Sequence, residues 1–479
     1  MQGRTGKALF WTLLDVGASQ GLSFLLYVIL TRILTPGDYG VFALSLSVTS
    51  ILNIVAFQGF GDALIQREAT SEDDRSTAFW TTLALGTLLG LGLALAAPYL
   101  ARAFEIEALG PVLQAMSLLC PLRALISVQT ALCRRDLHVA IFALRAIGAY
   151  LVGGAIGIAL ALRGWGIWSL VICQIVQALF MLVVMWTTVS WVPRLRFSHA
   201  SFRALAGFSR HFLAASLLIS IADKIDNLVI GLVLDAPSVG HYNLALKVLQ
   251  AAGLLTMAPL LPLLLPVLSR LAHDRAAFRD EYVRLVSGCL VMAMPLAAGL
   301  GILAPRLVPL AFGPQWDGAV PVLQAMCLGS AVAPLWSFTG QALSAQGQPK
   351  RFAWLASLQV LLASAAFLAA SLFGIVAVGL AWALVSIALV PLHVVTLKRV
   401  VGVSFAPLLV QALRIAAATL SMAVVMVAEA RLLGGPIWLT AATGILVYAV
   451  AIELAFLPGY LSRLLHSAWS LLRLVDRLS

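Results

Sequence analysis

Charged residues are scarce in this sequence. Asp, Glu, Lys and Arg together make up 11% of its 479 residues, against roughly 25% in a soluble domain. Hydrophobic residues make up 61%, and the mean hydropathy is +1.00. So few charges cannot cover the surface of a soluble protein of this length, and we predict an all-α integral membrane protein, because lipid leaves no backbone polar group unpaired.

Paired cysteines are also missing. The five cysteines are odd in number and show no C-x-x-C spacing: Cys120, Cys133, Cys173, Cys289 and Cys327. A disulfide framework and a zinc site are therefore not expected. All five lie in or beside apolar runs, where a cysteine behaves as a small apolar side chain. We expect no metal and no other cofactor.

Motifs of catalysis and nucleotide binding are absent as well. The sequence contains no G-x-x-x-x-G-K-[ST], no G-x-S-x-G and no H-E-x-x-H, which argues against an ATPase and against common hydrolases. No basic tract is interleaved with aromatic residues, so the net charge of +11 gives no reason to expect a nucleic-acid partner. The prediction is a protein that is not an enzyme.

Long apolar runs are what the chain has in abundance. A bilayer core of about 30 Å takes roughly 20 apolar residues per helix, and we predict about fourteen transmembrane helices. They lie near residues 9–31, 41–64, 77–100, 109–132, 140–162, 166–189, 210–234, 242–268, 285–304, 318–342, 353–373, 375–397, 408–428 and 436–457.

Lysine and arginine are placed unevenly between the loops. Of the 31 such residues, five fall within the predicted helices and five in the loops of one side (Arg32, Arg102, Arg163, Arg306 and Arg431), which leaves 31 − 5 − 5 = 21 for the other side. Cytoplasmic loops carry the excess of positive charge. We therefore expect both termini in the cytoplasm.

One six-letter segment occurs twice. PVLQAM stands at 111–116 and again at 321–326, six predicted helices later, and GIWSLV at 166–171 loosely matches GLAWALV at 379–385. An even offset preserves orientation, so the sequence predicts two parallel six-helix bundles related by a pseudo-twofold axis along the membrane normal. The predicted divisions are an N-terminal bundle (1–190), a cytoplasmic linker (191–206), a C-terminal bundle (207–400), and two additional helices with a cytoplasmic amphipathic tail (401–479).

Polar residues inside the predicted helices are costly in lipid, so each should face protein or water. The candidates for lining a cavity or coupling an ion are Asp15, Asn53, Gln114, Asp223, Asp226, Asn243 and Gln324. For the two glutamines, cavity lining and plain helix packing fit equally well. For Asp226, an ion pair and a role in coupling both remain open.

Four cations within the predicted helices are candidates for binding an anion: Arg123, Arg145, Lys224 and Lys247. A guanidinium can donate two parallel hydrogen bonds to phosphate oxygens, and a lysine ammonium supplies a compact positive charge. A structural ion pair with Asp15, Asp223, Asp226 or another acid is the alternative use of each. Two glycine pairs at i, i+4, Gly86 with Gly90 and Gly153 with Gly157, predict close helix packing.

Six stretches of the sequence have a distinctive pattern: TRILTPGDYGVFAL (31–44), GFGDALIQRE (59–68), STAFW (76–80), ALCRRDLHVAIFALR (131–145), GWGIWSLV (164–171) and DNLVIGLVLDAPSVGHYNLALKV (226–248). Together they resemble the polysaccharide transport family, the flippases for lipid-linked oligosaccharides in the superfamily of multidrug, oligosaccharidyl-lipid and polysaccharide exporters.

The resemblance implies a protein of the bacterial inner membrane that moves an oligosaccharide on polyprenyl diphosphate between leaflets by alternating access. Its product would feed exopolysaccharide, capsule or lipopolysaccharide synthesis, and a polysaccharide polymerase or another biosynthetic membrane protein is an expected partner. A cationic cavity for the diphosphate is implied too.

Two other functions stay open at this point. A multidrug cation antiporter of the same superfamily would depend on acids such as Asp15 or Asp226. A membrane-embedded glycosyltransferase would need catalytic acids at the membrane edge, and the acids near predicted edges have no supporting motif: Asp38, Asp62, Asp235 and Asp317.

Overall fold

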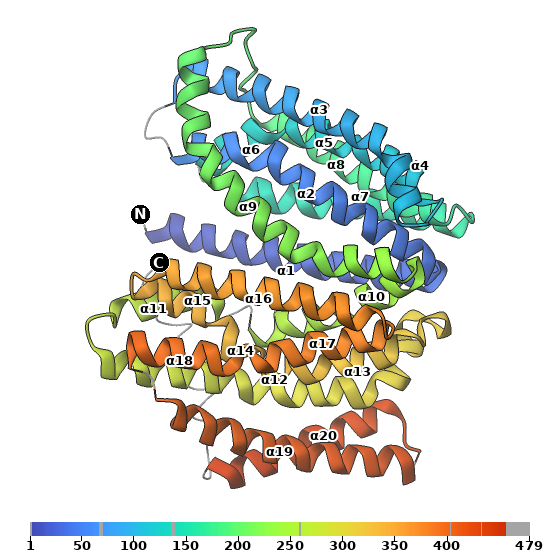
Figure 1. The fold of residues 1–479 in the computed structure, drawn as a ribbon, viewed down its shortest axis with the longest axis vertical. Coiled ribbons are helices and arrows are strands. Elements are labelled where there is room, and N and C mark those ends of the chain that lie inside the picture. The colour runs from blue at the N-terminus through green and yellow to red at the C-terminus, as the bar shows by residue number, and fades with distance from the viewer. Residues whose placement is uncertain are drawn as a thin grey trace. The chain divides into compact units, whose positions relative to one another are not determined.

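The computed structural model describes residues 2–66, 70–135, 139–257, 260–402, 404–432 and 434–456, and within these ranges every element is helical (Figure 1). The first nine helices are α1 (Gln2–Ile33), α2 (Pro36–Gln66), α3 (Glu72–Ala103), α4 (Leu109–Ser117), α5 (Leu119–Ala124), α6 (Ser127–Arg135), α7 (Val139–Leu162), α8 (Ile167–Thr188) and α9 (His199–Val233).

The remaining helices are α10 (Ala236–Thr256), α11 (Leu261–Arg270), α12 (Arg275–Phe312), the 3-10 turn η1 (Pro314–Trp316), α13 (Ala319–Ser330), α14 (Ala333–Ser337), α15 (Thr339–Ala345), α16 (Pro349–Ser371), α17 (Ile375–Ala388), α18 (Val390–Val401), α19 (Phe405–Leu432) and α20 (Ile437–Phe456).

Many of these helices are long and apolar enough to cross a bilayer. Among the described residues eight qualify, and the number rises to ten if each of two bent pairs is one span. The chain is therefore an all-α, multi-pass membrane protein, as the composition predicts. The total of fourteen spans and the layout in two parallel bundles stay predictions.

The two PVLQAM copies occupy equivalent places in the two bent pairs. The first copy lies in α4, and its span bends by 42° before α6; the second lies in α13, and its span bends by 52° before α14 and α15. Val112, Leu113 and Met116 are buried, and so are the matching residues of the second copy, Val322, Leu323 and Met326. The two copies therefore bury the same face of a bent helix.

Contacts divide the chain into two compact units, residues 1–240 and 241–478. Helix α9 falls in the first unit, where it packs along α2, although the predicted linker would make it the first helix of the C-terminal bundle. Its N-terminus is capped by Ser198, whose hydroxyl accepts from the Ser201 amide. The connection between α8 and α9 is thus residues 189–198, shorter than the predicted 191–206.

This connection is fixed to the start of α3. The Trp80 indole donates to the Arg194 carbonyl (2.8 Å) and the Trp191 indole donates to a Glu72 carboxylate oxygen (2.7 Å). The Ser76 and Thr77 hydroxyls accept from backbone amides of the connection. A segment bound in this way holds α9 beside α3 in the first unit.

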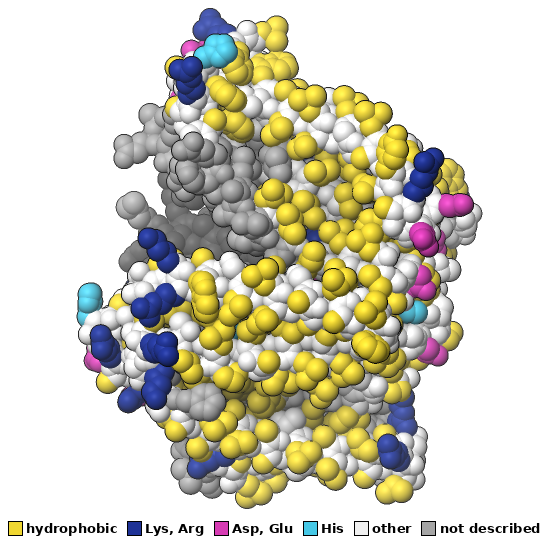
Figure 2. Space-filling model, in the orientation of Figure 1, with side chains coloured by type: hydrophobic (Ala, Val, Ile, Leu, Met, Phe, Trp, Pro, Cys, Tyr) yellow, Lys and Arg dark blue, Asp and Glu magenta, His cyan; other side chains and the backbone are white. Residues whose placement is uncertain are grey.

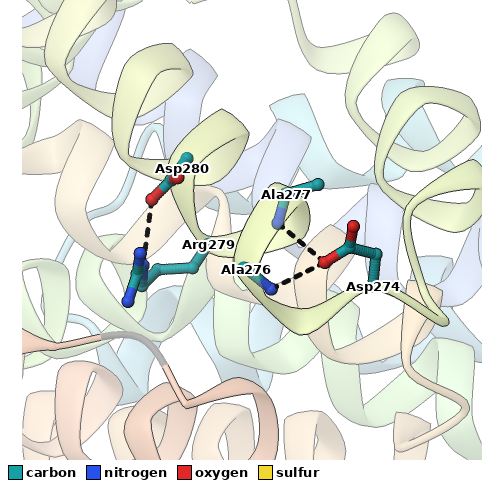
Figure 3. Close-up of polar contacts among 5 residues, drawn as sticks. All are labelled: Asp274, Ala276, Ala277, Arg279 and Asp280. Atoms are coloured by element: carbon teal, nitrogen blue, oxygen red, sulfur yellow. Dashed lines mark hydrogen bonds and ion pairs between the residues drawn. The ribbon is translucent and has the colours of Figure 1, made fainter.

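The second unit begins its longest helix with a capped turn. The Asp274 carboxylate accepts from the amides of Ala276 and Ala277 at the start of α12, and Arg279 pairs with Asp280 one turn further (Figure 3). An acid at this position satisfies amides that have no partner within the helix. In the same unit, hydrophobic side chains cover the middle of α16 and α17, and Lys and Arg gather at the end where α18 finishes (Figure 2).

Candidate functional site

A cavity of about 630 Å³ lies within the first unit. Five helices build its wall: Ser50 and Asn53 come from α2, Arg123 from α5, Arg145 from α7, Gln174 and Gln177 from α8, and Ser216, Ser220, Asp223 and Lys224 from α9. Three of the four predicted anion-binding cations therefore share one cavity, together with two of the predicted polar residues, Asn53 and Asp223. The volume is in the range of small-molecule sites, about 300–1,000 Å³.

The cavity carries positive charge. Its three cations and one carboxylate, Asp223, give a formal net charge of 3 − 1 = +2. In the part of the chain that the structure describes, neither Arg123, Lys224 nor Asp223 makes a side-chain hydrogen bond or ion pair. No close ion pair therefore occupies Arg123 or Lys224, although Lys224 interacts electrostatically with the neighbouring Asp223 carboxylate.

Two pairs of glycines position the helices that carry the cations. A Cβ at Gly86 would lie 2.8 Å from the Ala124 Cβ, and one at Gly90 would lie 2.9 Å from the Ser117 carbonyl oxygen. On α7, a Cβ at Gly153 would lie 2.5 Å from the Gln177 Cγ. The predicted close packing is confirmed: it brings α5 onto α3 and α8 onto α7.

The polar side chains along one face of α2, Ser45, Thr49 and Asn53, form hydrogen bonds within their own helix. The hydroxyls of Ser45 and Thr49 donate to backbone carbonyls four residues earlier, and the Asn53 amide nitrogen does the same to Thr49 (2.8 Å). The buried Asn53 Oδ1 has no hydrogen-bond partner among the described residues. Of this stripe, Asn53 is the residue that reaches the cavity, where its oxygen can accept from a ligand hydroxyl.

Two glutamines and two serines of the wall were not among the sequence candidates: Gln174, Gln177, Ser216 and Ser220. Gln174 and Gln177 are three residues apart and so share one face of α8. The Gln177 amide donates to the Cys173 sulfur (3.3 Å). An i, i+3 pair of amides in an otherwise apolar helix is the signal that could have identified this wall.

The other predicted residues lie elsewhere. Lys247, Asn243 and Gln324 belong to the second unit, and Gln324 donates to the Gly301 carbonyl (3.0 Å), a helix-packing contact. Gln114 is on an exposed face of α4 and does not line the cavity. Asp226, on α9, accepts from the Asn227 amide (2.7 Å).

The side chain of Asp15 lies outside the described residues. Among the residues that are described, no group of three or more His, Cys, Asp or Glu side chains is placed to hold a metal ion. The arrangement as a whole offers fork-shaped and compact positive charges beside neutral amides and hydroxyls. Such a wall fits a ligand with an anionic part and a hydroxyl-rich part.

The fold is similar to those of two solved membrane transporters. Its structure superposes on the lipid II flippase MurJ in an inward closed conformation with a TM-score of 0.75, at 14% identity over 93% of this chain and 98% of that one. An inward-facing multidrug resistance transporter of the MATE family matches with a TM-score of 0.61, at 16% identity over 83% and 95%. Identities this low show a common fold and nothing about the ligand.

Sequence comparison gives the family. Residues 29–321 match the family described as polysaccharide biosynthesis protein, and the chain belongs to it. The succinoglycan biosynthesis transport protein ExoT of Rhizobium meliloti is 27% identical over 78% of this chain and 75% of that protein. The lipopolysaccharide biosynthesis protein WzxC of Escherichia coli is 23% identical over 71% and 69%. The predicted resemblance is confirmed.

Proposed function

We propose that this protein is a flippase that carries an oligosaccharide linked to polyprenyl diphosphate across the bacterial inner membrane, for exopolysaccharide, capsule or lipopolysaccharide synthesis. The observation that carries the proposal is the net positive cavity of the first unit, with Arg123, Arg145 and Lys224 in one wall. The relatives support the substrate class, since ExoT is named as a transport protein of succinoglycan biosynthesis and WzxC as a protein of lipopolysaccharide biosynthesis.

In this proposal the diphosphate enters the cavity and the two arginines bind its oxygens in bidentate geometry. Lys224 adds a compact charge that tolerates a moving ligand. Neutral partners such as Asn53, Gln174 and Gln177 meet the sugar hydroxyls. The polyprenyl tail stays in the lipid, so only the polar head must cross the membrane.

Translocation follows from alternating access: the two predicted bundles rock about the bound head and open the cavity first to one side of the membrane and then to the other. The protein acts as a transporter and not as an enzyme, because no covalent bond of the substrate changes. A biosynthetic membrane protein such as a polymerase would use the product. Lys247, a further cation within a predicted helix, is proposed as another contact for the diphosphate.

The direct test is leaflet translocation of a lipid-linked oligosaccharide diphosphate in proteoliposomes. We expect transport by the wild type and at least a tenfold loss in Arg123→Ala, Arg145→Ala and Lys247→Ala, with Arg102→Ala, an exposed arginine outside the cavity, as the matched control. Failure of the wild type to transport this lipid, together with export of an organic cation that requires Asp223 or Asp226, would assign the protein to multidrug antiport instead.

A further inference from the structure

A second hollow, of about 420 Å³, lies in the second unit and takes no part in the proposed flipping site. It is formed by the first turns of α16 and the last turns of α18. Lys350, Arg351 and Trp354 come from α16, and Thr396 and Arg399 from α18. We call it the α16–α18 basic pocket.

The pocket presents three cations and no acid. Lys350, Arg351 and Arg399 make no side-chain hydrogen bond or ion pair within the described ranges of the chain. Other cations of this unit are paired: Arg279 contacts Asp280 (2.9 Å; Figure 3), and Arg284 contacts Glu281 (2.6 Å). Three unpaired like charges in one hollow repel each other, and an anion bound between them would remove the repulsion.

The fold itself does not require these charges. The repeat offset is 210 at PVLQAM and 213 to 214 at GIWSLV, which pairs Arg399 with Met185 or Trp186 and places Lys350 and Arg351 opposite the segment DLHVAI at 136–141. The first half of the chain therefore has no lysine or arginine at the matching positions. Because the repeat folds without them there, the cations of the second half serve something other than packing.

The pocket also lies at a defined depth. The spans Pro349–Ser371 and Ile375–Val401 run in opposite directions across the membrane, so the start of the first and the end of the second meet on the same side. Lys and Arg gather at this end of the unit in Figure 2. Trp354 is 59% exposed, and tryptophan at the end of a span marks the level of the lipid headgroups.

We propose that the α16–α18 basic pocket binds the phosphate of an anionic membrane phospholipid. The two cations of α16 and Arg399 contact the phosphate oxygens, and the Trp354 ring packs beside the glycerol region. The acyl chains lie along the apolar faces of α16 and α17, where Leu361, Leu368 and Leu384 are exposed. This inference does not depend on the substrate of the flippase.

The test compares two variants of the full-length protein with equal loss of charge. The first is Lys350→Gln/Arg351→Gln/Arg399→Gln, and the control is Arg270→Gln/Arg275→Gln/Lys398→Gln, three exposed cations that do not line the pocket. Each purified protein is titrated with phosphatidylglycerol or phosphatidylethanolamine, and the bound lipids are counted by native mass spectrometry.

We expect the wild type and the control to bind one phosphatidylglycerol in preference to phosphatidylethanolamine. The pocket variant should bind phosphatidylglycerol about tenfold more weakly, because each cation near an anionic lipid contributes to the binding free energy. Equal loss in both variants would assign the effect to general surface charge and overturn the proposal, as would no loss in either. Displacement of the lipid by soluble glycerol phosphate at equal concentration would also overturn it, because the pocket would then recognise phosphate without its membrane anchor.

Discussion

At the scale of single residues, two isosteric substitutions in the cavity change its charge in opposite directions. Asp223→Asn raises the formal net charge from +2 to +3, and Asn53→Asp lowers it to +1. A unit charge about 8 Å away is worth about 2 kcal/mol at an effective dielectric constant of about 20, and partial solvation reduces this. We expect a lipid-linked diphosphate to bind about threefold to tenfold more tightly to Asp223→Asn and correspondingly more weakly to Asn53→Asp.

The measurement is a binding titration in detergent, with an uncharged polyprenyl alcohol as the control ligand. Its affinity should be the same for the wild type and both variants. The opposite order, with weaker diphosphate binding to Asp223→Asn and stronger binding to Asn53→Asp, would show that the cavity selects cations.

Two further residues, Gly40 and Gly240, pack α2 and α10 backbone to backbone. A Cβ at Gly40 would lie 1.7 Å from the Ala236 carbonyl oxygen, and one at Gly240 would lie 2.1 Å from the Pro36 carbonyl oxygen. Because backbone cannot move aside as a flexible side chain can, we expect Gly40→Ala or Gly240→Ala to lower the apparent melting temperature by about 5 °C or more.

The melting temperature can be followed by size-exclusion chromatography of heated samples. Gly92→Ala is the matched control, since a Cβ there has nothing within 4 Å and alanine favours a helix over glycine. If the Gly40 and Gly240 variants had the same melting temperature as this control, the close contact would be contradicted.

At the scale of elements, an arginine of α12 binds the turn of the α19–α20 hairpin. The Arg306 guanidinium donates to the Gly435 carbonyl (2.8 Å) and to the Ala430 carbonyl (2.9 Å), both beside the turn of the hairpin. Hydrogen bonds to a charged group contribute about 1.5–3 kcal/mol each. We expect Arg306→Gln to speed amide hydrogen exchange in residues 430–440 at least tenfold. Unchanged exchange, or an equal effect from the exposed neighbour in Arg431→Gln, would contradict this role.

The existence of the helices was easier to predict than the points at which a span is broken into shorter helices. The run 77–100 becomes α3 because a long, mostly apolar segment in lipid has few alternatives to a helix. The run 109–132 is divided into α4, α5 and α6, and these breaks were not predicted because tertiary packing, not composition, decides where such a helix bends. Similarly, the basic stretch 191–206 marked a linker, but only contacts reveal that α9 joins the first unit.

The same reasoning explains which parts of the candidate site were predicted. Arg123, Arg145 and Lys224 were identified because a charge in the membrane is costly and so is kept for a purpose. Gln174 and Gln177 were missed because neutral amides are cheaper to bury and are common in helix packing. Gln114 and Gln324 were included on the strength of the repeat, yet the shared property of the two copies is the buried face formed by valine, leucine and methionine.

At the scale of the whole molecule, the sequence predicts fourteen spans with both termini in the cytoplasm, and the loops offer exposed positions that can test it. All five native cysteines are buried, so a cysteine introduced at the surface can be labelled against a low background. Leu195 is 89% exposed and lies between α8 and α9; Leu432 is 81% exposed and lies at the end of α19.

We expect a membrane-impermeant maleimide added outside intact spheroplasts to label Arg163→Cys and Leu432→Cys, which lie on the predicted periplasmic face. It should label Leu195→Cys and Lys398→Cys only after the membrane is permeabilised. The reason is that 21 of the Lys and Arg residues fall on the side of Leu195 and Lys398, the side that positive charge directs to the cytoplasm. Arg163 and Leu195 test the predicted N-terminal bundle, and Lys398 with Leu432 tests the first of the two additional helices. Labelling of Lys398→Cys and Leu432→Cys from the same side would mean that α19 does not span the membrane, and the count of fourteen would be wrong.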